Sequence, residues 1–138
     1  MMKINPEEFT QKAWQGIIDA KDLAINEKHQ ILETEHLLYS LIKKNEIAIN
    51  AIEKSGGSIK SLLVEIEEFI KTQPKMQKAQ ESIFFGKNIS LAISKANKIK
   101  NSYKDNFISS EHLVISLFDD ERVCHKLFIQ NKINKNSL

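Results

Sequence analysis

Residues 34–42 read TEHLLYSLI, and residues 110–118 read SEHLVISLF, 76 positions further along the chain. The same offset, without gaps, also matches apolar residues on both sides of these segments. The matched pairs are Phe9 with Phe85, Ile17 with Ile93, Ala20 with Ala96, Ile47 with Val123 and Ile52 with Phe128. Apolar positions kept in phase over this length indicate an internal repeat. The sequence therefore predicts two repeats with one architecture.

Each repeat shows the apolar spacing of α-helices. Over 10–25 the apolar side chains recur near the helical period, and Thr10 can cap the helix N-terminus. Pro6 marks a rival start, because proline suits the first helical position. Further helices are expected over 34–44, 46–54 and 58–72 in the first repeat. Their counterparts in the second repeat are expected over 86–101, 110–119 and 121–131.

These ranges predict an all-α fold of two tandem, pseudo-symmetric four-helix repeats. Repeat one is expected over about 6–72, a polar linker over about 73–81 and repeat two over about 82–138. An eighth helix is expected from about Asn134. The chain ends at Leu138, whereas the counterpart helix in repeat one continues to about Thr72. We therefore expect the last helix to be truncated.

Composition argues against several classes of protein. The net charge is only +2, and Arg122 is the only arginine among 20 basic residues. Arginine is the usual reader of phosphates and guanines, so we expect no specific nucleic-acid binding. Cys124 is the only cysteine, which excludes an internal disulfide. No apolar run approaches the roughly 18 residues of a membrane span. We expect a monomeric, cytoplasmic domain that contacts no membrane.

The lysine-rich stretch 82–104 could attract an acidic partner, because it carries five lysines and no acid. We interpret it as a solvated helix face.

The chain lacks the patterns of catalytic and nucleotide-binding sites. Gly86-Lys87 fails the phosphate-loop pattern, because Asn88 follows it and Glu81 stands where the first glycine belongs. The four histidines lack the spacing of metal ligands on one helix face. Cys124 and His125 are adjacent, and adjacent residues on a helix do not face each other. We expect no catalytic residue, no metal and no cofactor in this domain.

Residues 9–14 read FTQKAW, 33–38 read ETEHLL and 105–113 read DNFISSEHL, and Pro74-Lys75 follows the fourth expected helix. These four segments resemble the N-terminal domain of ClpB-type disaggregase chaperones, and Pro74-Lys75 lies where that family joins its repeats. The resemblance implies an eight-helix domain, mobile on a linker ahead of two ATPase modules that use ATP and Mg²⁺. It implies capture of unfolded or aggregated polypeptide and its transfer to the pore of a hexamer. It also ties Thr10, Asp105 and Glu111 to substrate handling.

A hydrophobic groove between the repeats is expected to take the peptide. We predict that it is lined by Phe9, Ala13, Phe84, Phe85 and Ile89. Phe9 and Phe85 precede equivalent helices, so a pseudo-twofold axis would bring them near one another. Gly86 departs from the family, which usually has a capping Ser or Thr there.

Two alternatives remain open at this point. The first is an adaptor-docking domain of a protease-associated ClpA or ClpC unfoldase, and the second is a stand-alone regulator of this fold.

Overall fold

A computed structural model describes residues 4–78 and 82–138 of the chain. Repeat one begins with a short 3-10 helix (Pro6–Glu8) and the long helix α1 (Gln11–Asn26). The two-residue strand β1 (Ile31–Leu32) leads into α2 (Thr34–Lys44), α3 (Glu46–Lys54) and α4 (Ile59–Thr72). Thr10 caps α1 as predicted, since its side chain accepts a hydrogen bond from Ala13 N. Of the predicted linker 73–81, residues 79–81 lie outside the described residues.

Repeat two follows the same order. It contains β2 (Phe84–Phe85), α5 (Lys87–Ser102), α6 (Ser110–Phe118) and α7 (Cys124–Gln130). Helix α7 begins three residues later than predicted, because Asp120 accepts the backbone N–H groups of Val123 and Cys124 and so fixes the start of the helix. In place of the predicted eighth helix, the described chain ends in one 3-10 turn (Lys135–Ser137). The fold is all-α apart from the two short strands, which were not predicted.

The two repeats interlock through reciprocal strand pairs. Leu32, just before α2, pairs with Phe85, just before α5. At the equivalent place, Ile108 pairs with Phe9 near the start of α1. The backbone hydrogen bonds are also equivalent: Gly86 N–H donates to Leu32 O at 2.9 Å, and Thr10 N–H donates to Ile108 O at 2.9 Å. We call these two contacts the first joint (Leu32 with Phe85 and Gly86) and the second joint (Ile108 with Phe9 and Thr10).

A second pair of reciprocal bonds joins the helices beyond the joints. Thr34 Oγ1, at the start of α2, donates to Asp120 Oδ2 at 2.8 Å. Asn45 Nδ2 donates to Ser110 Oγ, at the start of α6, at 2.8 Å. Asn45 caps α3, and Asp120 accepts the backbone N–H groups of Val123 and Cys124 at the start of α7. In each repeat the side chain that fixes the start of the third helix thus also bonds the second helix of the other repeat.

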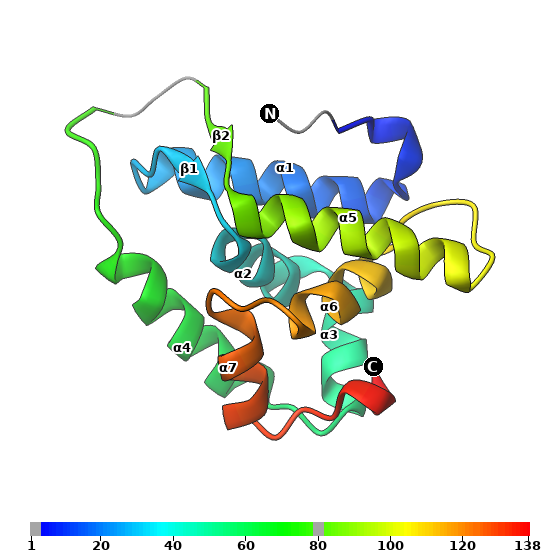
Figure 1. The fold of residues 1–138 in the computed structure, drawn as a ribbon. Coiled ribbons are helices and arrows are strands. Elements are labelled where there is room, and N and C mark those ends of the chain that lie inside the picture. Colours follow the sequence, from blue (N-terminus) through cyan, green and yellow to red (C-terminus); the bar gives the residue numbers. More distant parts are fainter. Residues whose placement is uncertain (1–3, 79–81) are drawn as a thin grey trace.

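Helix α2 lies at the centre of the molecule, where it contacts α1, α3, α4, α5, α6 and α7. Figure 1 shows α1 and α5 in the upper part of the view, α2 and α6 in its middle, and α4, α7 and α3 below them. The buried apolar side chains come from both repeats and form one cluster. Among the largest fully buried members are Ile17, Leu37, Ile52, Ile66 and Phe128. The two repeats therefore share a single hydrophobic core.

Candidate functional site

Thr10 lies at the second joint, at the N-terminus of α1. Its Oγ1 accepts a hydrogen bond from Ala13 N at 3.1 Å, and its backbone N–H bonds to Ile108 O. Ile108 stands between Asp105 and Glu111 in the sequence. The second joint therefore gathers the three predicted substrate-handling residues around one inter-repeat contact.

Asp105 is exposed and holds a histidine of the next helix. One carboxylate oxygen lies 2.9 Å from His112 Nε2, and 51 % of the Asp105 side chain is exposed. His112 Nδ1 accepts the backbone N–H of Ser109 at 2.9 Å, so the neutral ring carries its proton on Nε2 and donates it to Asp105. Asp105 keeps its second oxygen available at the surface.

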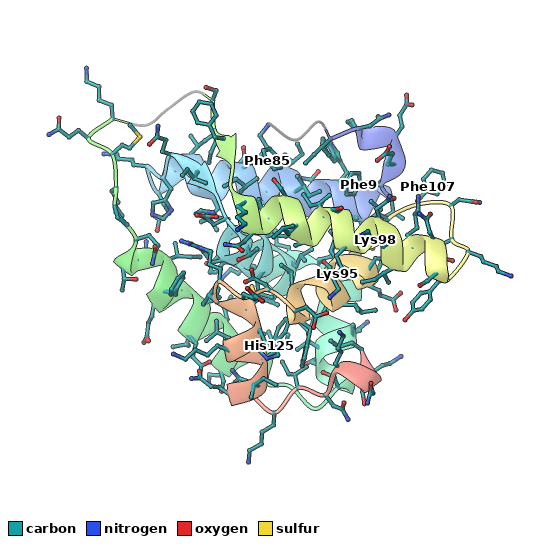
Figure 2. All side chains as sticks on the ribbon, in the orientation of Figure 1. Phe9, Phe85, Lys95, Lys98, Phe107 and His125 are labelled. Atoms are coloured by element: carbon teal, nitrogen blue, oxygen red, sulfur yellow. The ribbon has the colours of Figure 1, made fainter. Side chains whose placement is uncertain are left out.

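Glu111 lies in the first turn of α6 and is exposed. A carboxylate there is favoured by the helix dipole. Two large apolar side chains of the same region are also exposed: 59 % of Tyr103 and 50 % of Phe107. The segment 103–111, which contains Ile108 of the second joint, thus carries two exposed acids and two exposed aromatic rings, and Phe107 is labelled in Figure 2.

The predicted groove residues have different environments. Phe9, Ala13 and Ile89 are buried, with exposed fractions of 6 %, 0 % and 0 %, so they pack into the shared core. Phe85 is half-buried, and Phe84 is exposed. Phe9 and Phe85 belong to two separate joints (Figure 2). Of the five residues, Phe84 and Phe85 therefore offer a surface to a peptide in this structure.

Phe84 belongs to an exposed apolar pair at the first joint. Its strand partner in β1 is Ile31, which is also exposed. The repeat offset makes Ile31 the counterpart of Phe107 at the second joint. Each joint thus carries an exposed large apolar side chain at the same position.

Sequence reasoning missed the role of Arg122. Its guanidinium bonds both oxygens of Glu35, at 2.9 and 3.1 Å, and also bonds Gln73 Oε1 at 3.2 Å. It lies 3.4 Å from Glu33 Oε2 and 5.7 Å from the centre of the Phe69 ring. The side chain of Glu35 is only 1 % exposed, and its bond raises the pKa of Arg122. The clue in the sequence was that the only arginine stands where repeat one has Glu46.

A cavity of about 240 Å³ lies beside this ion pair. It is lined by residues of β1, α2 and the segment after α4, together with Arg122. His29 and His36 reach it, and their rings are in contact, with His29 Nδ1 2.8 Å from His36 Nε2. Burial lowers the pKa of both rings, that of His36 to about 3.

The described residues 4–78 and 82–138 contain no group of three His, Cys, Asp or Glu side chains arranged for a metal ion. Cys124 is fully buried, which raises the pKa of its thiol and keeps it protonated. His125 Nδ1 lies 2.7 Å from Phe118 O, to which it donates. Within the same ranges, no helix combines the length and apolar character needed to cross a bilayer.

Known proteins resemble the chain over its whole length. It is 42 % identical over 137 residues to the chaperone protein ClpB of Prochlorococcus marinus, covering 99 % of this chain and 16 % of that protein. It is 37 % identical to the chloroplastic chaperone protein ClpB2 of Oryza sativa, covering 99 % of this chain and 14 % of that one. The chain thus spans about a sixth or less of the curated relatives that it matches.

Solved structures share the fold. The Hsp104 N-terminal domain of Candida albicans superposes with a TM-score of 0.84 at 19 % identity, covering 94 % of this chain and 85 % of that one. The N-domain of ClpV from Vibrio cholerae gives 0.78 at 14 % identity, covering 100 % and 90 %. The sequence profile of the Clp repeat (R) N-terminal domain matches residues 8–131. The chain belongs to the Clp repeat (R) N-terminal domain family.

Proposed function

We propose that this domain engages substrates for a ClpB-type protein disaggregase and binds unfolded or aggregated polypeptides. The similarity to ClpB chaperones along 99 % of the chain carries the proposal. The relatives are about six times longer, which leaves room for ATPase modules in a parent protein. ATP and Mg²⁺ would act in those modules, and the isolated domain would be a monomer that hydrolyses no ATP. We place its action in the cytoplasm.

The second joint supplies a surface suited to such substrates. An unfolded chain exposes apolar side chains, which Tyr103 and Phe107 can cover. It also exposes backbone N–H groups and basic side chains, and the carboxylates of Asp105 and Glu111 can accept hydrogen bonds from both. A flexible substrate loses entropy when it is held, so we expect micromolar or weaker affinity.

The proposal is tested by Asp105→Asn, Glu111→Gln and Thr10→Ala in the full-length parent protein. Asp105→Asn keeps an acceptor for His112 but removes the charge, and Glu111→Gln alters an exposed side chain. Both variants should lose aggregate reactivation while the melting temperature of the domain is almost unchanged, because exposed substitutions stay within about 0.5 kcal/mol. Thr10→Ala should also lose the helix cap, worth about 1 kcal/mol.

Glu67→Gln is the matched control, since Glu67 is an exposed acid on α4. It should leave reactivation at the wild-type level. Binding of the isolated domain to an unfolded casein is followed by NMR. If reactivation merely follows melting temperature across the four variants, or if casein perturbs only residues far from the second joint, the site assignment fails.

A further inference from the structure

The His29–His36 pair has a fixed direction of hydrogen bonding. Glu33 N–H donates to His36 Nδ1 at 2.9 Å, so the proton of the neutral ring must be on Nε2. His36 Nε2–H therefore donates to His29 Nδ1. The remaining proton of His29 is on Nε2, which is the buried side-chain N or O atom without a hydrogen-bond partner among the described residues. Each neutral ring thus has one permitted tautomer.

An added proton cannot be accommodated in this series of hydrogen bonds, from Glu33 to His36 to His29, without breaking one of them. Protonated His29 would point Nδ1–H at the Nε2–H of His36. Protonated His36 would point Nδ1–H at the backbone N–H of Glu33. In either case two donors face each other, so the ring pair or the cap of α2 is lost. The rings cannot turn freely to avoid this, since His29 is 4 % exposed and His36 is 1 % exposed.

Repeat two has a different pair at the equivalent positions. Asp105 replaces His29 and His112 replaces His36, and the carboxylate accepts the Nε2–H of the ring. Ser109 Oγ also lies 3.2 Å from His112 Nδ1. In repeat two a carboxylate thus takes the place of the second imidazole, so the bond to the ring Nε2–H does not depend on a neutral imidazole as its acceptor.

The charges around the repeat-one pair do not remove the conflict. Glu27 follows α1, Glu33 and Glu35 come from the start of α2, Lys71 and Lys75 come from the end of α4 and the segment after it, and Arg122 comes from the loop before α7. Each carboxylate has a basic partner: Glu27 has Lys71 and Lys75, and Glu33 and Glu35 share Arg122. No acid in this set is positioned as Asp105 is, directly on a ring nitrogen.

We propose that the His29–His36 pair is an acid-sensitive latch that keeps the first joint closed at neutral pH and releases it on protonation, while the second joint stays closed. The latch holds the start of α2. The first turn of this helix carries Glu35, which bonds Arg122, and the strand just before it carries Leu32, which bonds Gly86. Its release would free the exposed pair Ile31 and Phe84 from their fixed register and widen the adjoining cavity.

The sign of the pH dependence follows from linkage. The folded-state pKa of His36 is about 3 and that of His29 is also lowered, whereas histidines in an opened segment titrate near their ordinary value of about 6.5. Below about 6.5 the opened form binds more protons than the closed form, so stability is lost as pH falls. Above that value both forms are neutral and the latch is fully effective.

Amide exchange of the wild-type domain tests the proposal, because the two joints contain equivalent amides. Gly86 N–H reports on the first joint and Thr10 N–H on the second. After correction for intrinsic exchange, opening at Gly86 should increase at least about tenfold between pH 7.5 and 5.5, since each freed histidine of ordinary pKa changes the equilibrium by about that factor. Thr10 should change much less. Equal increases at both amides would show global unfolding and overturn the proposal.

His29→Asp copies the pair of repeat two and should abolish the extra opening at Gly86. The double variant His29→Gln with His36→Gln serves the same purpose if the aspartate variant does not fold, because it removes both titrating rings. His125→Gln is the control, since His125 is exposed and lies outside the pair. Persistence of the tenfold increase in the His29 variants, or its loss in His125→Gln, would refute the latch.

Discussion

At the scale of single residues, the two joints fill equivalent positions with side chains of different size. Gly86 is the counterpart of Thr10, and Glu33 is the counterpart of Ser109. A Cβ on Gly86 would overlap the carboxylate of Glu33. The first joint therefore combines a large residue with glycine, whereas the second combines two small hydroxyl residues. This accounts for glycine at position 86, where the resemblance leads one to expect a capping Ser or Thr.

Gly86→Thr should destabilise the domain by about 1–3 kcal/mol, the usual cost of overpacking. The φ of Gly86 is −71°, so the backbone tolerates a side chain and the cost arises from Glu33. Adding Glu33→Ser should recover much of the loss, because the double variant copies Thr10 and Ser109. A double-mutant cycle by urea unfolding measures the coupling. Additive effects would show that the two sites do not compete for space.

Arg122 determines whether Glu35 is tolerated in the interior. Arg122→Ala leaves a buried carboxylate without its partner and should cost about 3–5 kcal/mol. Combining Arg122→Met with Glu35→Leu should recover most of that stability, since apolar replacement of a buried ion pair is often neutral. Thermal unfolding monitored by circular dichroism provides the comparison. If the double variant is no more stable than Arg122→Ala, the ion pair has a structural role beyond charge compensation.

At the scale of elements, each helix start that holds the other repeat is fixed by a polar side chain. Asp120 accepts from Thr34 and from two backbone N–H groups of the α7 start, and it is buried. Asn45 is half-buried; its side chain accepts from Ala48 N at the start of α3 and donates to Ser110. Asp120 and Asn45 thus make similar bonds but differ in their exposure to water.

Asp120→Ala should therefore cost more than Asn45→Ala. Loss of a helix cap is worth about 1 kcal/mol, and buried donors left unpaired add about 1–3 kcal/mol. We expect a total of about 2–4 kcal/mol for Asp120→Ala and about 1 kcal/mol for Asn45→Ala, where water can replace the lost acceptor. Urea denaturation of both variants checks the order, and equal losses would contradict the role assigned to burial.

Several elements could be predicted from sequence because their signals are local. Caps and apolar spacing placed α1, α2, α3 and α4 within a residue or so of their observed ends. The joints were missed, since two-residue strands have no recognisable periodicity and their partners are far away in sequence. The burial of Ala13 and Ile89 was missed as well, because both follow a helix start and only tertiary packing, which the sequence pattern does not show, buries them.

The candidate site was predicted in part. Thr10, Asp105 and Glu111 were selected by resemblance, and their substrate role stays a prediction. Their common position at the second joint depends on the pairing of Phe9 with Ile108, which spacing within one repeat cannot reveal. The ion pair of Arg122 with Glu35 likewise joins residues 87 positions apart.

At the scale of the whole molecule, the repeats form one cooperative unit. Both joints, both capping bonds and the Arg122 ion pair cross between repeats. The apolar cluster is also common to both halves. Neither half can bury its own apolar surface, as is usual for repeat architectures.

Separately produced fragments 1–78 and 82–138 should therefore be largely unfolded, with weak helical signals in circular dichroism. Mixing them should restore helicity with a dependence on concentration, because association supplies the missing contacts. The intact domain should unfold in one transition by both far-ultraviolet and tryptophan signals. A stable fold of either fragment alone would contradict the shared core.

The pairing of Phe9 with Ile108 also determines when the domain can complete its fold during synthesis on the ribosome. The start of α1 acquires its partner only after Ile108 has been synthesised and has left the exit tunnel. At about 5–20 residues per second, this takes on the order of 5–20 seconds. During that interval α1 and α2 lack the part of the shared apolar cluster that repeat two supplies. The nascent first repeat is therefore expected to expose apolar surface until the second repeat has been synthesised.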